Sequence, residues 1–157
     1  VARGSSLYPS EAYAPELFDL RKRIVFTDRI TMVAASNDRT DGVWIGTESQ
    51  VIWLGGASPG EWELRTVASY GVIPGTMVIT DSEILGAAEA AGKQAVMFAT
   101  QRGLCVGLPD GQFKNMTEQR FAYPAAQRGA GLVRRHRGII QYIVSLEGVE
   151  TPGNVAA

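Results

Sequence analysis

The stretch Asp41-Gly-Val-Trp-Ile-Gly-Thr-Glu-Ser-Gln-Val-Ile-Trp-Leu-Gly-Gly56 contains two short apolar runs that are rich in β-branched and aromatic residues. The runs are residues 43–45 and 51–54, and the residues between them are mostly polar and compatible with a turn. Glycines open the first run and close the second. This pattern predicts a β-hairpin, and we expect that hairpin to form the middle of one sheet.

The segments on either side of this hairpin complete a predicted sheet. Residues 24–26 and 30–34 are short strand candidates before it. After it, Trp62, Leu64, Thr66 and Ala68 alternate with more polar residues, as in a half-exposed outer strand. Short turns join these segments, so the sequence predicts an antiparallel meander of four strands.

A second group of strand candidates follows residue 76. Residues 77–79, 95–99, 104–108 and 112–117 are predicted strands, and residues 86–92 a surface loop. Pro109-Asp110-Gly111 has the chemistry of a tight turn, because proline presets its φ and glycine accepts a positive φ. Residues 130–134 and 139–146 form a predicted final hairpin around Arg135-His136-Arg137-Gly138.

The two groups suggest an internal repeat. Gly42-Val-Trp-Ile-Gly-Thr47 and Gly103-Leu-Cys-Val-Gly-Leu108 share the order glycine, three apolar residues, glycine. Four-stranded antiparallel units that repeat every ~40–50 residues are typical of propeller blades. We therefore predict an all-β fold of antiparallel meander sheets arranged as propeller-like blades, a partial propeller. A β-sandwich, in which glycine-edged strands also recur, is the alternative.

The predicted organisation has three parts. Residues 1–22 form an irregular N-terminal arm, residues 23–147 a β domain of about two blade-like sheets and a final hairpin, and residues 148–157 a flexible or continuing tail. The chain begins at Val1 without a start methionine, and closed propellers have about four to eight blades. We therefore expect the rest of a ring to lie outside this segment or to come from other chains, and the missing methionine favours the first.

Composition places the chain among globular proteins and gives no sign of a charged ligand. The 157 residues are 45% hydrophobic and 20% charged, with a net charge of −1, so no overall field favours nucleic acid or a membrane surface. No apolar run approaches the ~20 residues that span a bilayer. Cys105 is the one cysteine. We expect it to be a small buried hydrophobe rather than a nucleophile.

The strongest charge cluster is Arg134-Arg135-His136-Arg137, at the predicted tip of the final hairpin. It could contact a nucleic-acid backbone or an acidic subunit, and the alternative is a solvated turn. His136 is the only histidine, and no acid, base and nucleophile cluster around it. We therefore predict no catalytic residues and no enzymatic activity.

Two further sets of residues are candidate ligand sites. Oxygen-bearing side chains that could bind Ca²⁺ cluster in one loop but lack EF-hand spacing, which favours a solvated loop; they are Asn37, Asp38, Asp41 and Glu48. Three tryptophans could stack on sugars, yet apolar neighbours favour core packing for the first two; they are Trp44, Trp53 and Trp62. We predict neither a cofactor nor a metal.

Several of these motifs together resemble a segment of tailed-bacteriophage structural proteins. The first is Asp41-Gly-Val-Trp-Ile-Gly-Thr47, with Val51-Ile-Trp-Leu-Gly-Gly56 and Ser58-Pro-Gly-Glu-Trp62 after it. The downstream matches are Thr100-Gln-Arg-Gly-Leu-Cys-Val-Gly-Leu-Pro-Asp-Gly111, Thr117-Glu-Gln-Arg-Phe-Ala-Tyr-Pro124 and Ala130-Gly-Leu-Val-Arg134. The resemblance covers roughly residues 24–147, and its motifs are structural.

The resemblance implies a virion component of the tail, such as the nozzle of short-tailed particles, assembled in the host cytoplasm. We expect its partners to be other virion subunits in a homo-oligomeric ring, with the basic tip facing packaged or translocating DNA or another subunit. The alternatives are a propeller-type carbohydrate-binding or sensor domain that uses exposed tryptophan and, less favoured, a propeller hydrolase.

Overall fold

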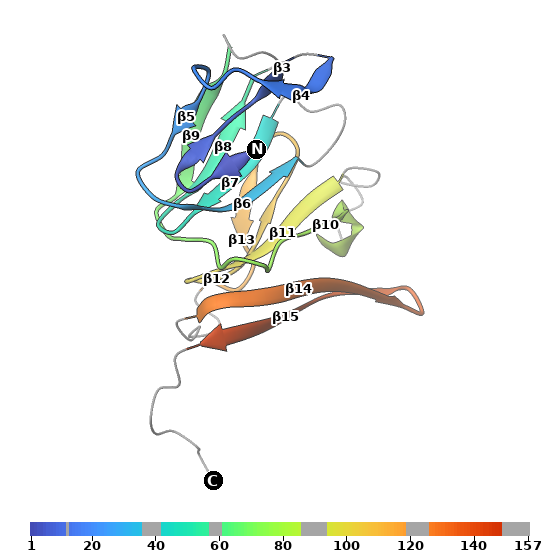
Figure 1. Ribbon diagram of the computed structural model, residues 1–157. Helices are drawn as coiled ribbons and strands as arrows, with labels where there is room; N and C mark the ends of the chain where they lie inside the picture. Colours follow the sequence, from blue (N-terminus) through green and yellow to red (C-terminus); the bar gives the residue numbers. More distant parts are fainter. Residues whose placement is uncertain (12, 36–41, 57–60, 86–93, 119–125, 149–157) are drawn as a thin grey trace.

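A computed structural model describes residues 1–11, 13–35, 42–56, 61–85, 94–118 and 126–148 (Figure 1). The described elements are β1 (Ala2–Arg3), β2 (Ser6–Leu7), β3 (Ser10–Glu11), β4 (Ala14–Phe18), β5 (Ile24–Val25), β6 (Ile30–Ala35), β7 (Gly42–Thr47), β8 (Val51–Gly55), β9 (Glu63–Ala68), β10 (Val78–Asp81), the 3₁₀ turn η1 (Ser82–Leu85), β11 (Gln94–Thr100), β12 (Gly103–Gly107), β13 (Phe113–Asn115), β14 (Ala126–His136) and β15 (Ile139–Gly148). No helix among them is long and apolar enough to cross a membrane.

The first sheet is a four-stranded antiparallel meander in the order β6-β7-β8-β9. The predicted central hairpin is confirmed, with Trp44 opposite Trp53 and Gly46 opposite Val51. The outer strand β9 is also confirmed, and Leu64 and Thr66 share one face as predicted, but the prediction that Ala68 lies on the same face is wrong. A register shift places Ala68 opposite Val51 and Thr66 opposite Ile52, so Thr66 and Ala68 face opposite sides of the sheet.

The second sheet is an antiparallel meander in the order β10-β11-β12-β13. Its central strand β11 is buried from Ala95 to Thr100, as expected for a strand covered on both faces. Residues 69–77, here called the crossover, lead from the outer strand β9 of the first sheet to the first strand β10 of the second. Val72 donates a backbone hydrogen bond to Thr47 (2.9 Å) and Ile73 to Ala99 (2.9 Å), so the crossover joins both sheets.

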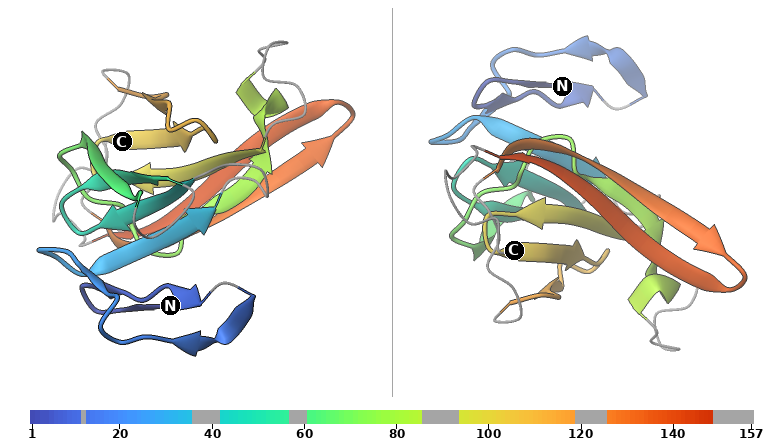
Figure 2. Two further views of the ribbon diagram at one scale, coloured as in Figure 1. Left: turned by 90° about the horizontal axis from the view of Figure 1, so that it is seen from above. Right: turned by 90° about the horizontal axis from the view of Figure 1, so that it is seen from below.

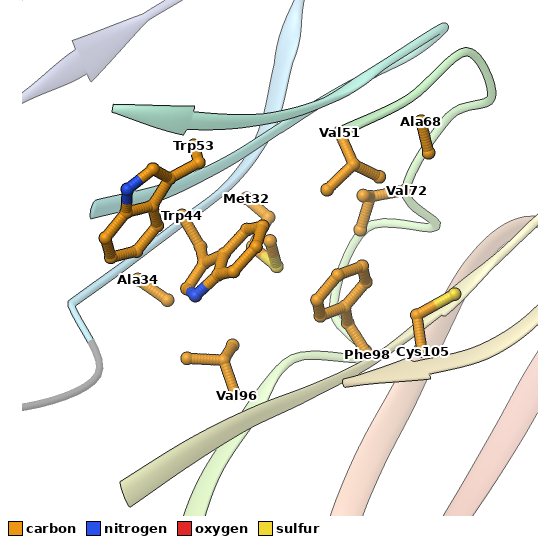
Figure 3. Close-up of a cluster of buried hydrophobic side chains, with 10 residues drawn as sticks. All are labelled: Met32, Ala34, Trp44, Val51, Trp53, Ala68, Val72, Val96, Phe98 and Cys105. Carbon is orange, nitrogen blue, oxygen red and sulfur yellow. The ribbon is translucent and has the colours of Figure 1, made fainter. Parts of the chain in front are cut away.

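The two sheets stack face to face, and the main core lies between them (Figure 3). Trp44 is fully buried, its ring centroid lies 4.9 Å from that of Trp53, and its indole N–H donates to the carbonyl of Leu108 at 3.1 Å. The members of this core cluster are Met32, Ala34, Trp44, Val51, Trp53, Ala68, Val72, Val96, Phe98 and Cys105. The faces that meet here are called the near faces, and the opposite ones the far faces.

The N-terminal arm covers the far face of the first sheet. Leu7 packs with Ile45, Ile52 and Leu54 in a second cluster. The arm was predicted to be irregular, but β1 pairs with β2, β2 pairs with β5, and β3 pairs with β4. These strands are two to five residues long, too short to give a periodic signal in the sequence.

The far face of the second sheet is covered in part by η1 and by the hairpin of β14 and β15. Tyr142 of β15 packs against a third cluster that contains Ala95, Met97 and Val106. The order of layers is therefore arm, first sheet, second sheet, hairpin (Figures 1 and 2). Of the tail predicted for residues 148–157, Gly148 ends β15 and the remainder lies outside the described residues, as does the loop predicted for residues 86–92.

The all-β prediction is confirmed, since the chain consists of several antiparallel sheets. Each large sheet is a simple meander, so the chain completes one sheet before it begins the next, unlike a Greek-key sandwich. The proposed alignment of the repeat is wrong. Residues 42–47 form β7, the second strand of its sheet, whereas residues 103–107 form β12, the third strand of its sheet.

Candidate interaction surface

The hairpin of β14 and β15 is fixed at its base to the crossover by backbone hydrogen bonds. The amides of Gly129 and Gly131 donate to the carbonyls of Pro74 (2.9 Å) and Gly75 (3.2 Å). The hydroxyl of Tyr142 donates to the carbonyl of Thr76 at 2.5 Å. These bonds join the edge of β14 that does not pair with β15 to the crossover. The base of the hairpin is therefore held against the two stacked sheets.

Glycine makes this close approach possible. A Cβ atom on Gly131 would lie 2.2 Å from the carbonyl oxygen of Thr76, and one on Gly75 would lie 2.1 Å from that of Gly129. Both distances are far below van der Waals contact, and both involve backbone atoms. These residues were not predicted from the sequence, although glycines at alternate strand positions, as in Gly129-Ala-Gly131, do indicate close backbone approach on one face.

The tip of the hairpin is a two-residue turn formed by Arg137 and Gly138. Both have positive φ, 48° and 79°, which matches the twist of the flanking strands in a type I′ turn. His136 lies opposite Ile139 at the end of the ladder. In Figure 2 the tip extends beyond the stacked sheets, which makes it available to a partner.

The predicted basic cluster is divided between the two faces of the hairpin. The side chain of Arg135 forms an ion pair with Asp81 at the end of β10. Arg134 and His136 alternate with Arg135 along β14 and lie on the outer face, away from the second sheet. All four residues of the cluster, including Arg137, are exposed. Arg135 also holds the hairpin to β10 through its ion pair with Asp81.

The outer face of the hairpin also carries exposed apolar side chains. Leu132 and Ile143 are directly opposite one another and are 54% and 43% exposed, and Ile139 near the tip is 60% exposed. At the base of the same face Arg128 binds Glu147, with one nitrogen–oxygen distance of 2.9 Å. This hydrogen bond raises the pKa of the Arg128 guanidinium. The outer face is thus apolar at its centre and charged at both ends.

A polar groove of about 720 Å³ lies between the base of the hairpin and the start of β6. Arg29 and Glu48 line it from the first sheet, and Arg128 and Glu147 line it from the hairpin. Both acidic and basic side chains therefore line the groove. Such a surface suits a polar protein neighbour better than a ligand of one charge.

Cys105 lies in the core as expected and is not placed to act as a nucleophile. It is fully buried, 3.6 Å from the Thr100 hydroxyl, and burial raises the pKa of its thiol to about 11. A thiolate is therefore unfavourable in the folded protein at neutral pH.

The structure also places the three tryptophans and one of the four candidate Ca²⁺ ligands. Trp44 and Trp53 are buried between the sheets. Trp62 is partly buried and packs against the second cluster, which contains Leu7. Glu48 is exposed, whereas the other oxygen ligands weighed for Ca²⁺, residues 37, 38 and 41, lie outside the described residues. Within the described part of the chain no group of three His, Cys, Asp or Glu side chains is arranged to hold a metal ion.

Comparison with known proteins gave no match: no family model, curated protein or solved structure is similar to this chain.

Proposed function

We propose that this chain is a structural component of a tailed-phage virion, in the tail or head–tail assembly, that acts through subunit interfaces in a symmetric complex. The proposal draws on the resemblance of residues 24–147 to tailed-phage structural proteins. It assigns the chain no catalytic role and no cofactor. In this proposal the two meander sheets correspond to neighbouring blades of a propeller-like ring, assembled in the host cytoplasm and retained in the virion.

The observation that carries the proposal is the hairpin of β14 and β15. Its base is fixed to the crossover through Gly129, Gly131 and Tyr142, while its outer face and basic tip project. A long, rigidly mounted hairpin with exposed apolar residues such as Leu132 is typical of an element that enters a neighbouring subunit. In this proposal the hairpin is the surface through which the chain assembles with its neighbours.

The basic tip has a more specific role in this proposal. Arg134 and Arg137 face solvent at the end of the hairpin, where they can contact phosphates of packaged or translocating DNA. An acidic surface of another subunit would attract the same charges. Trp44 and Trp53 lie buried in the core, where they cannot stack on a sugar, so they do not support the carbohydrate-binding alternative.

Two measurements test the structural role. Native mass spectrometry of the full chain over a range of concentrations is expected to show discrete oligomers, and antibody labelling of purified virions is expected to place the chain in the tail. A chain that stays monomeric at every concentration, binds glycans in an array and is absent from virions would refute the proposal.

A further inference from the structure

A hollow of about 350 Å³ lies where β8 ends and β9 begins, beside the turn that follows β12. Its volume is within the roughly 300–1,000 Å³ that is usual for ligand pockets. Its wall includes the indole of Trp53, the carboxylates of Glu61, Glu63 and Asp110, and the guanidinium of Arg65, all in the described part of the chain. We call it the acidic hollow, because it has three carboxylates and one guanidinium.

The negative charge of the acidic hollow is not balanced by its own residues. The three carboxylates belong to exposed residues, and none of them forms an ion pair with another described residue. The guanidinium of Arg65 already donates to the carbonyl of Gly111 at 2.5 Å. Asp110 accepts only from a neutral donor, the amide of Gln112, at 3.1 Å. A cationic side chain that entered the hollow would therefore form charge-assisted hydrogen bonds with these carboxylates.

Trp53 contributes a buried donor that lacks an acceptor. It is only 8% exposed, and its indole N–H has no acceptor in the described part of the chain, whereas the N–H of Trp44 donates to Leu108 at 3.1 Å. In Figure 3 the nitrogen of Trp53 lies on the side of its ring away from Trp44. It lies beside Gly111, as the guanidinium of Arg65 does, and thus at the wall of the acidic hollow. An acceptor brought in by a ligand would satisfy this N–H.

The tip of the hairpin of β14 and β15 carries the complementary groups. Arg134 and Arg137 are exposed, and neither forms an ion pair with another described residue. The carbonyl groups of the turn residues Arg137 and Gly138 lie outside the hydrogen-bonded ladder. A Cβ atom on Gly138 would meet nothing within 4 Å, so the tip is narrow and nothing packs against it. The tip therefore offers cations for the carboxylates and a carbonyl acceptor for the N–H of Trp53.

The tip of one chain lies far from the acidic hollow of the same chain. In Figure 1 the hairpin is the lowest layer and its tip projects to the right, whereas β8 and β9 lie in the upper part of the molecule. Contact between tip and hollow therefore requires two copies. Such a contact is heterologous, because it joins two different surfaces, and it can repeat from copy to copy into a ring or a filament.

We propose that the acidic hollow binds the basic tip of the hairpin of a second copy of this chain. Arg134 and Arg137 of one copy pair with the carboxylates of the other, and a turn carbonyl accepts from the N–H of Trp53. The proposal rests on the proposed function and deepens it, since it names the two surfaces through which neighbouring subunits join.

The first test measures self-association of the full chain by sedimentation velocity. Arg137→Ala and Glu63→Lys are each expected to weaken it at least about tenfold, because each removes a charge-assisted contact. The matched controls are Arg128→Ala, at the base of the same strand, and Glu16→Lys, at an exposed position of the arm. Both controls are expected to change the association less than about twofold.

A mixture of the two variants tests whether the contact joins tip to hollow. Arg137→Ala retains an intact hollow and Glu63→Lys an intact tip, so an equimolar mixture is expected to form dimers. These dimers are expected to grow no further, since the tip and the hollow that remain are both altered. An isologous contact between two tips or two hollows would not be restored by mixing.

The indole N–H resonance of Trp53 reports on the acidic hollow itself. Isotope-labelled Arg137→Ala, which has the intact hollow, is titrated with unlabelled Glu63→Lys. The resonance of Trp53 is expected to shift, whereas that of Trp44, which is bonded to Leu108, is expected to stay in place. Dimers that leave the Trp53 resonance unchanged would place the contact elsewhere and overturn the proposal.

Three other results would also overturn it: a wild-type chain that stays monomeric at every concentration, variants that associate as the wild type does, or a mixture that stays monomeric. Virion labelling is an independent measurement. A chain that is present in tails but lacks this contact would remove the present proposal alone. A chain that makes the contact but is absent from virions would remove the proposed function alone.

Discussion

Thr47 and Thr100 make the same hydrogen bonds in corresponding turns of the two stacked sheets. The Thr47 hydroxyl accepts from the amide of Ser49 (3.3 Å) and donates to the carbonyl of Gln50 (3.4 Å). The Thr100 hydroxyl accepts from the amide of Arg102 (3.2 Å) and donates to the carbonyl of Gly103 (2.8 Å). Each turn joins the second and third strands of its sheet, so these threonines, rather than the glycine-edged strands, mark the internal repeat.

Replacing Thr100 with valine is expected to destabilise the fold by about 1–3 kcal/mol, because the amide of Arg102 and the carbonyl of Gly103 lose their hydrogen bonds to the buried Thr100 hydroxyl. Valine preserves the shape of the side chain and removes only the hydroxyl. The free energy of unfolding in urea measures the effect. Thr66→Val, at an exposed position of β9, is the matched control and is expected to change it by less than about 0.5 kcal/mol. Equal effects of the two substitutions would contradict this role of Thr100.

Contact between Gly107 and Trp44 gives a prediction about the core between the sheets. A Cβ atom on Gly107 would lie 2.4 Å from the Trp44 ring, so Gly107→Ala is expected to destabilise the protein by about 1–3 kcal/mol. Trp44→Phe removes part of that ring. In a double-mutant cycle the pair is expected to be non-additive by at least about 0.5 kcal/mol, because the smaller ring makes room for the new methyl group. Additive effects would show that the steric conflict is relieved elsewhere.

The sequence predicted local structure better than the equivalence of distant strands, and the glycines explain why. Gly42 is required because a Cβ there would lie 2.1 Å from the ring of Trp53, whereas Gly103 has a φ of +140° in a turn. The two glycines are thus required for different physical reasons. Aligning them in sequence matched the second strand of one sheet to the third strand of the other. The hairpin tip at Arg137 was predictable, since turn residues between two apolar runs are a local signal.

The anchoring of the hairpin could not be predicted, because it depends on backbone contacts between the crossover and β14, which are distant in sequence. Gly131→Ala is expected to separate the base of β14 from Thr76, since the added methyl would meet that backbone carbonyl. The amides of Gly129 and residue 131 would then lose protection in hydrogen exchange. Ala130→Ser, on the exposed outer face, is the control and should leave both amides protected. Unchanged protection in the Gly131→Ala protein would show that the hairpin docks by other contacts.

Burial of Cys105 predicts a loss of stability at alkaline pH. Burial raises its pKa from the ordinary 9.0 of a cysteine thiol to about 11 in the folded protein, so the folded state holds the proton more tightly. This stabilising contribution is fully present below pH 9 and is lost as the pH rises toward 11. Urea midpoints of the wild type and Cys105→Ala, compared from pH 7 to 10.5, isolate the effect from other titrating groups. Parallel pH profiles for the two proteins would contradict it.

The position of Arg134 and Arg137 at the projecting tip predicts a salt-dependent affinity for DNA. If these side chains contact phosphates, Arg134→Ala and Arg137→Ala should each reduce the slope of log affinity against log salt by about 1. Arg128→Ala is the matched control, because Arg128 lies at the base of the same strand and is bound to Glu147. Fluorescence anisotropy with labelled duplex DNA over a range of salt concentrations measures the three slopes. If all three substitutions lower the slope equally, the affinity comes from diffuse charge on the hairpin and not from its tip.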